Sequence, residues 1–298
     1  MLTQRQSRYS IPPRFFDFAI LGILVLLYAP LIYYWYDGWI NKNISIEHEY
    51  FSHGIIGLPF AAYLIWMNRK QWQRLPNITN LLGGILLALG GVFYLSGVSE
   101  WVNLSFPIIL AGLCLWLKGI AGFKLQGFPL LLILLATPNS LPYLIAPFTL
   151  PLQSFIAGTA GFILNQFGLP IVVDGINIYA RGRIVEVAPY CAGLKMLFTT
   201  MYVGLILLYW TETLSSRRKT IWFLSMAGII SVTANIIRNT LLTFFHATGQ
   251  DGAFHWLHDS WGGDVYSACM LLTLIPVINW IDTYFSEDSQ INAEDVIQ

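Results

Sequence analysis

Residues 181–197 read RGRIVEVAPYCAGLKML, and this stretch decides how we interpret the rest of the chain. A polar segment that favours short strands interrupts a hydrophobic sequence and then delivers Cys191 to the start of an apolar helix. Backbone N–H groups and the positive dipole at a helix N-terminus stabilise a thiolate. We therefore interpret Cys191 as a candidate nucleophile. A small residue that merely begins a helix is the alternative, and the pattern alone does not choose between them.

The composition predicts a membrane protein. The chain has 298 residues, of which 56% are hydrophobic and 11% are charged, whereas soluble domains carry about 25% charged residues. Its net charge of zero gives no indication of nucleic-acid binding. The fold class that follows is an all-α polytopic membrane protein.

Eight spans are predicted, because a membrane helix needs roughly 20 mostly apolar residues. They cover approximately residues 16–36, 54–67, 81–97, 103–117, a fifth from about 128, 191–210, 221–245 and 265–284. Residues 1–284 then form one integral membrane domain. The acidic residues 285–298 are expected to be a disordered cytoplasmic tail.

Positive charge assigns the two sides of the membrane. Arginine and lysine collect in short cytoplasmic loops, and the chain has basic clusters at its N-terminus and at residues 69–74, 118–124 and 217–219. All four lie on the cytoplasmic side only if residues 145–167 do not cross the membrane. We therefore expect that stretch to be re-entrant or to lie along the outer interface.

Residues 168–190 and 246–264 are then both outside. In the first of these segments, alternating apolar residues and the turns Asp174-Gly175 and Arg181-Gly182 predict short hairpin strands.

Arg238 lies within the apolar run SVTANIIRNTLLTFF. An arginine in a span costs several kcal/mol unless it is paired or faces a cavity, so it is a candidate functional residue. Asn235, three residues earlier, shares its helix face. Held in place, the guanidinium would present two N–H donors to an oxyanion. The alternative is an arginine that reaches outer lipid head groups.

His258 belongs to the outer loop sequence FHWLHDSWGGD. Its imidazole exchanges a proton near neutral pH, which a thiol nucleophile and an amine leaving group both require. His255 is a rival on the same face, and His246 and Asp259 are weaker candidates. The alternative for each histidine is an interfacial ring without a chemical role.

The membrane topology predicts that Cys191, Arg238 and His258 lie at one outer face, although they come from three spans. The sequence does not predict a metal site, since the histidines lack the HExxH pattern and no second cysteine stands near Cys191. We expect Cys114 and Cys269 to be apolar packing residues.

Several other polar residues are candidates for supporting roles. Lys195, one turn into the helix after Cys191, would add positive charge near the thiol. The element Glu47-x-Glu49-Tyr50-Phe51-Ser52-His53-Gly54 lies at the start of the second span, and its two carboxylates, tyrosine and histidine would recognise a substrate. An interfacial anchor with solvated charges is the alternative.

These residues resemble a known family, the exosortases and archaeosortases, and among them most closely the cyanobacterial variants. The resemblance covers roughly residues 49–284. It rests on the following elements: Cys191-Ala192-Gly193-Leu194, Asn235-x-x-Arg238, His258 with Gly262, Tyr50-x-Ser52-His53-Gly54, Leu64-x-Trp66 with Arg69, and Leu152-Gln153-Ser154. Pro189-Tyr190 departs from the Glu-Ala often found before the cysteine, and Glu186 is the carboxylate available to substitute.

The resemblance implies a membrane cysteine transpeptidase without a metal or organic cofactor. Its substrates would be secreted proteins of the PEP-CTERM type, which end in a short motif, one spanning helix and a basic tail. Cys191 would attack a backbone carbonyl, Arg238 would stabilise the oxyanion, and His258 would transfer protons. An unidentified acceptor nucleophile would receive the acyl group.

The resemblance also implies a multi-pass protein of the plasma (inner) membrane, with the lipid bilayer as a partner and its site on the extracytoplasmic face. The alternative functions are a membrane transporter, in which Arg238 would bind an anionic head group, and a non-catalytic factor for exopolysaccharide assembly or export.

Overall fold

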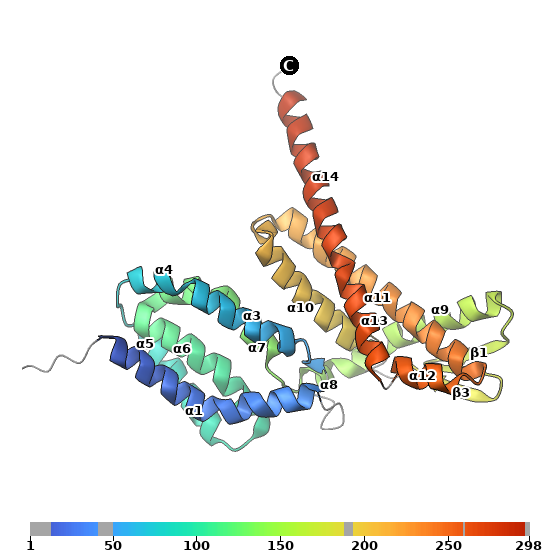
Figure 1. Ribbon diagram of the computed structural model, residues 1–298, viewed down its shortest axis with the longest axis horizontal. Coiled ribbons are helices and arrows are strands. Elements are labelled where there is room, and N and C mark those ends of the chain that lie inside the picture. The colour runs from blue at the N-terminus through green and yellow to red at the C-terminus, as the bar shows by residue number, and fades with distance from the viewer. Residues whose placement is uncertain (1–12, 41–49, 188–192, 259, 296–298) are drawn as a thin grey trace, which may run out of the picture.

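The computed structural model describes residues 13–40, 50–187, 193–258 and 260–295. Figure 1 shows two groups of helices side by side. The first group contains α1 (Pro13–Ile40), α3 (Gly54–Met67), α4 (Arg69–Arg74), α5 (Leu81–Leu95), α6 (Ser99–Leu125) and α7 (Gly127–Ala136). The second contains α9 (Leu150–Gln166), α10 (Leu194–Trp210), α11 (Arg217–Ala247), α12 (Asp251–His258), α13 (Trp261–Leu272) and α14 (Leu274–Asp295). The short helices α8 (Leu141–Ile145) and η1 (Ala146–Thr149) lead from one group to the other, and η2 (Thr213–Ser215) joins α10 to α11.

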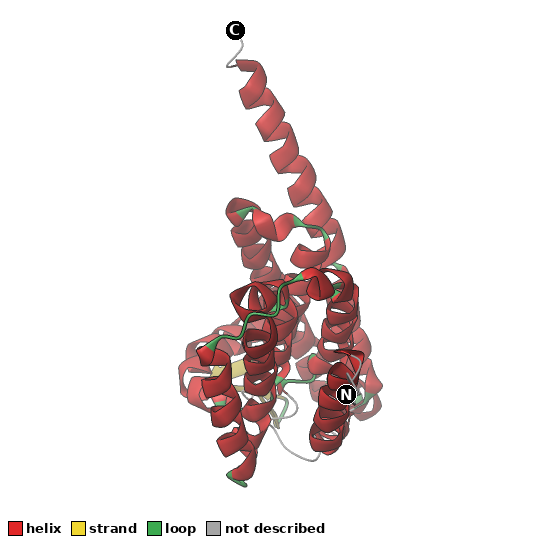
Figure 2. Ribbon diagram, turned by 90° about the vertical axis from the view of Figure 1, so that its left-hand side faces the viewer, coloured by secondary structure: helices red, strands yellow, loops and turns green. Residues whose placement is uncertain are grey.

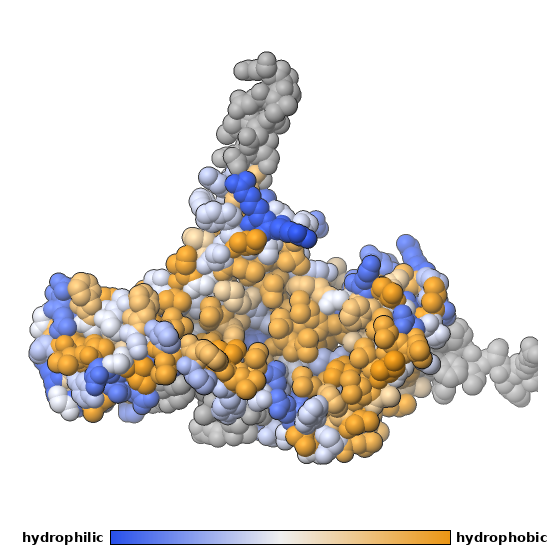
Figure 3. All heavy atoms as spheres, turned by 180° about the vertical axis from the view of Figure 1, so that it is seen from behind, coloured by the Kyte–Doolittle hydropathy of each residue, from blue (hydrophilic) through white to orange (hydrophobic). Residues whose placement is uncertain are grey.

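The predicted polytopic membrane fold is confirmed. Within the described residues, five helices are long and apolar enough to cross a membrane: Ala19–Ile40, Ser99–Leu125, Pro147–Gln166, Arg217–Ala247 and Trp261–Phe285. Four shorter apolar helices, α3, α5, α7 and α10, stand among them. Large apolar side chains are exposed on both groups, as Figure 3 shows, which is the pattern expected where lipid rather than water covers the helices.

The helix α9 lies within residues 145–167, the stretch that the distribution of positive charge predicts not to cross the membrane. It is apolar and long enough to cross a membrane. Its buried residues pack against the sheet and the final third of α11, including Ile236, Phe244 and Ala247. The 31 residues of α11 would extend about 46 Å at 1.5 Å each, beyond a hydrocarbon core of about 30 Å. The eight-span topology therefore stays a prediction.

The predicted hairpin strands are present as a three-stranded antiparallel sheet. Strands β1 (Ile171–Asp174), β2 (Asn177–Ala180) and β3 (Arg183–Glu186) pair in sequence order, with Val172 opposite Tyr179 and Tyr179 opposite Ile184. The second turn has positive φ at Arg181 (49°) and Gly182 (79°), the geometry that tight hairpin turns require. One face of the sheet packs on α9, which fixes it beside the end of α11.

The final helix, α14, projects from the rest of the chain in Figures 1 and 2. Its backbone is helical through Asp295, and the disordered cytoplasmic tail that we expect over residues 285–298 stays a prediction. The run SEDSQINAED contains neither proline nor glycine, so no residue in it interrupts a helix.

Tyr202 joins the two groups of helices. Its ring is 2% exposed and belongs to a cluster with Ala61 and Leu64 of α3 and Leu132 of α7. Its hydroxyl donates to the backbone oxygen of Leu132 over 2.9 Å. Gly57 permits this approach, because a Cβ there would overlap the Tyr202 hydroxyl.

We predict that Gly57→Ala lowers the stability of the protein by about 1–3 kcal/mol, because the added methyl group must displace Tyr202 from its buried position. Gly91→Ala is the matched control, since a Cβ at that helical glycine meets nothing within 4 Å. Thermal unfolding in detergent measures both changes. Equal melting temperatures for the two variants would contradict the proposal that the buried contact of Tyr202 with α3 and α7 stabilises the protein.

Candidate active site

Cys191 lies outside the described residues, and the structure places the residue two positions later. Gly193 caps the N-terminus of α10 in the left-handed region, with φ of 81°, and its oxygen accepts from the Leu197 N–H over 2.6 Å. A Cβ at Gly193 would lie 2.6 Å from Nδ2 of Asn235. Glycine therefore permits both the backbone conformation and the contact between the start of α10 and α11.

The buried side chain of Asn235 has a fixed orientation. It is 1% exposed, and its Oδ1 accepts from Nδ2 of Asn239 over 3.3 Å. Asn239 Nδ2 also donates to the backbone oxygen of Asn235 over 2.9 Å. The Asn235 amide N–H groups are thus turned towards Gly193, and they have no acceptor among the described residues.

Arg238 lies one turn further along the same face of α11 and reaches α12. Its Nη2 donates to the backbone oxygen of Leu257 over 3.4 Å, one of the carbonyls that the end of a helix leaves without a partner. A Cβ at Gly263 would lie 2.9 Å from the same carbonyl oxygen, so this glycine permits the start of α13 to pass close to the carbonyl that Arg238 contacts. The buried Nε of Arg238 has no partner within the described part of the chain.

His258 is the last residue of α12 and neighbours the carbonyl that Arg238 contacts. Its ring is half-buried and stacks on Phe254, with centroids 5.2 Å apart and planes 9° apart. His255 is exposed and meets Phe254 edge-on. His258 directly follows Leu257 in the chain, so it lies closer along α12 to the Arg238 contact than His255 does.

A polar network connects α12 to the sheet. Arg183 on β3 donates from Nη1 to Oδ1 of Asp251 over 2.5 Å, and this hydrogen bond is the main cause that holds the pKa of Asp251 below its usual value. His246, at the end of α11, lies 3.8 Å from the same carboxylate oxygen and packs on Phe254 with centroids 4.9 Å apart. Phe254 therefore lies between His246 and His258.

The other predicted residues have different surroundings. Tyr50 is buried against Leu194 and Phe198 of α10. His53 is 5% exposed and donates from Nε2 to the Leu135 oxygen over 3.1 Å. The His53 ring also packs on Tyr202 of α10, with centroids 4.4 Å apart. Both side chains thus contact α10, and their part in substrate recognition stays a prediction.

Three further predicted residues complete the set. Lys195 lies in the first turn of α10, and Glu186 is exposed at the end of β3. Glu49 lies outside the described residues, as does Asp259.

The structure thus brings the flank of Cys191, the pair Asn235 and Arg238, and the end of α12 into one chain of contacts. Among the described residues, no group of three or more histidine, cysteine or carboxylate side chains could hold a metal ion. Sequence reasoning missed Phe254 and Asn239. Each stands four residues from a predicted site residue on the same helix, so the helical spacing was the available signal.

The fold and this cluster define a class: a multi-pass membrane protein in which polar side chains of α11 meet both the start of an apolar helix just after a cysteine and the end of α12. The pattern of the transmembrane exosortase family matches residues 35–275. The chain therefore belongs to this family, and membership implies a membrane enzyme of protein sorting.

A second comparison gives a partial match. The chain is 32% identical over 122 residues to the ATP synthase subunit a of Erythrobacter litoralis (strain HTCC2594), which covers 37% of this chain and 45% of that protein. The chain thus spans less than half the length of this relative. No solved structure matches the chain significantly.

We predict that Phe254→Ala slows substrate processing about three- to tenfold, because a stacked aromatic pair contributes about 0.5–1.5 kcal/mol and the ring of His258 would lose its support. The pH profile of processing should shift as well, and Phe254→Tyr should restore both rate and profile. His255→Ala is the control and should change little. A Phe254→Ala protein with an unchanged rate and pH profile would refute the positioning role.

Proposed function

We propose that this protein is a cysteine peptidase or transpeptidase that cleaves C-terminal sorting signals of secreted proteins at the outer face of the membrane. One observation carries the proposal: a single face of α11 contacts both the start of α10 through Asn235 and the carbonyl beside His258 through Arg238. That face would hold a cysteine from one neighbouring helix and a histidine from another at the same level.

The first half of the reaction forms an acyl-enzyme. The thiolate of Cys191 attacks a backbone carbonyl carbon of the substrate and forms a tetrahedral oxyanion. Arg238 stabilises this negative charge with its N–H donors, as positioned cations and dipoles do in acyl transfer. The C–N bond then breaks while His258 gives a proton to the leaving amine, and a thioester remains on Cys191.

The second half transfers the acyl group. His258, now neutral, accepts a proton from an incoming amine or other nucleophile, or from water. The nucleophile attacks the thioester carbon, the second oxyanion forms at Arg238, and the C–S bond breaks to release the thiolate. Family membership supports a sorting enzyme, and the substrate of this chemistry is a secreted protein with the short motif, spanning helix and basic tail of the PEP-CTERM type.

We predict that Cys191→Ala abolishes C-terminal processing of a co-expressed substrate, a loss of more than about a thousandfold, because no other group replaces the nucleophile. Cys114→Ala and Cys269→Ala are the matched controls, and both should process normally. Immunoblots of the substrate, with enzyme levels measured in the same membranes, give the result. Full processing by Cys191→Ala would favour a transporter or a non-catalytic export factor instead.

We predict that Arg238→Lys lowers the rate of processing about 100- to 1000-fold, the usual effect of losing one oxyanion donor. A lysine keeps the positive charge, but it cannot present the planar fork of donors that contacts both the carbonyl of Leu257 and a reacting oxygen. Arg69→Lys, at the start of α4, is the control for arginine replacement in general. Turnover by Arg238→Lys at the level of the control would eliminate the oxyanion role.

A further inference from the structure

A groove lies between α3 and α10 at the ends of these helices farthest from the candidate active site. Its volume is 660 Å³. The lining includes Tyr63, Met67, Asn68, Tyr209, Trp210 and Glu212. Several of these side chains are well exposed: Trp210 is 59% exposed and Met67 is 51% exposed. The groove therefore offers aromatic and apolar surface next to a carboxylate.

Glu212 supplies the one formal charge among the described residues that line this groove. It follows α10 in the left-handed conformation, with φ of 58°, where glycine is usual and another residue is strained. Its carboxylate makes no hydrogen bond or ion pair with any residue that the structure describes. The hydroxyl of Ser215 donates to the backbone oxygen of Glu212 over 2.9 Å and not to its carboxylate.

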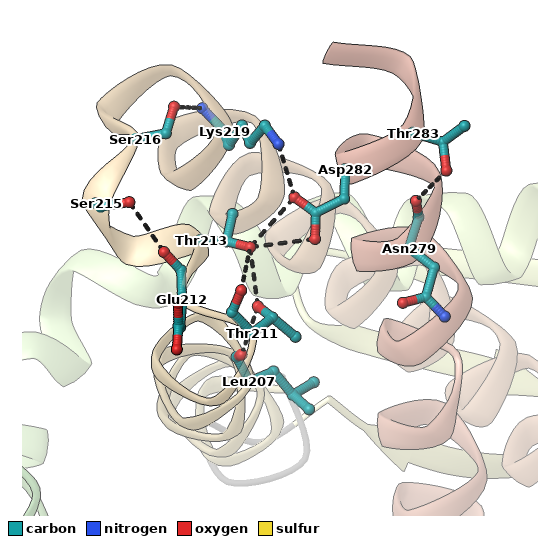
Figure 4. Close-up of polar contacts among 10 residues, drawn as sticks. All are labelled: Leu207, Thr211, Glu212, Thr213, Ser215, Ser216, Lys219, Asn279, Asp282 and Thr283. Atoms are coloured by element: carbon teal, nitrogen blue, oxygen red, sulfur yellow. Dashed lines mark hydrogen bonds and ion pairs between the residues drawn. The ribbon is translucent and has the colours of Figure 1, made fainter. Parts of the chain in front are cut away.

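Lys219, which Figure 4 draws in the same region, does not pair with Glu212. Lys219 donates from Nζ to Oδ1 of Asp282 over 3.0 Å, and the hydroxyl of Thr213 also donates to that carboxylate. Figure 4 shows this cluster apart from the side chain of Glu212. The carboxylate thus remains available to a positive charge from outside the chain.

The length of α10 relates the groove to the active site. From Gly193 to Glu212 are 19 residue steps, about 29 Å of helix, which equals the thickness of a hydrocarbon core of about 30 Å. A single membrane helix that lies along α10 with one end at Gly193 would have its other end at the groove. Chain that continues beyond that helix would then pass Glu212.

We propose that this groove receives the cytoplasmic end of the substrate's membrane anchor and that Glu212 pairs with lysine or arginine in the tail behind it. The proposal rests on the proposed function for its substrate. Trp210 and Tyr63 would pack on the apolar stems of these side chains and on the last turn of the anchor. An anionic lipid head group suits the groove poorly, because Glu212 would repel it.

The experiment compares two substrates, one with its basic tail and one with the tail lysines and arginines replaced by glutamine. Protease accessibility in membrane vesicles verifies that both have the same orientation. We predict that the wild-type enzyme processes the basic-tailed substrate about three- to fivefold faster, the upper part of the range for an exposed ion pair. Glu212→Gln should abolish this preference and leave the slower substrate unaffected.

Two further variants separate recognition from folding. Glu212→Gly removes the charge and relieves the left-handed strain, so it should also lose the preference while melting at an equal or higher temperature. Asp174→Asn, an exposed carboxylate in the β1–β2 turn, is the matched control and should keep the preference. If Glu212→Gln slows both substrates equally, or if it retains the preference, the proposal is wrong.

A cross-linking measurement separates this proposal from the proposed function. Leu214, 37% exposed beside the groove, is replaced by cysteine in a Cys191→Ala chain that also lacks Cys114 and Cys269, and a cysteine is placed in the substrate tail. If the disulfide forms but the wild-type protein does not process the substrate, the proposed peptidase function is wrong and the proposed role of the groove stands. If the wild-type protein processes the substrate but no disulfide forms, the proposed role of the groove is wrong. It is also wrong if anionic phospholipid vesicles alone protect the cysteine of Leu214→Cys from the cross-linking reaction.

Discussion

An arginine near the edge of an apolar environment must find partners, and the arrangement of the second helical group follows from how Arg238 does so. Its guanidinium reaches a carbonyl at the end of α12, which holds that helix against α11. The same contact satisfies a backbone group that the helix end leaves open. The guanidinium of Arg238, which would be costly in lipid without a partner, therefore holds the end of α12 at the candidate active site.

Glycines make the other approaches possible. Gly193 lets the start of α10 touch Asn235, Gly263 lets α13 approach the Leu257 carbonyl, and Gly57 admits Tyr202. In each case a Cβ would meet or crowd a polar atom. Helices that lack a hydrophobic driving force between them in lipid pack through such small residues and a few hydrogen bonds, and here the same contacts determine where the polar side chains lie.

Much of the architecture could be predicted because it depends on local pattern. Apolar runs of membrane length predicted the helices, and Asp174-Gly175 and Arg181-Gly182 predicted the turns of the sheet. The relation between Asn235 and Arg238 follows from helical spacing alone. The stack of Phe254 on His258 and the tie from Arg183 to Asp251 could not be read in this way, because they depend on how α12 docks against α11 and the sheet.

By itself the sequence determined a polytopic helical membrane protein, its small hairpin segment and its membership of the exosortases, since hydrophobic length, turn chemistry and short motifs are all carried by neighbouring residues. Only the tertiary structure decided that Gly193 meets Asn235, that Arg238 caps α12, and that Glu212 faces a groove between two helices. These contacts join residues from separate helices, and their geometry depends on packing angles and close approaches that no local pattern specifies.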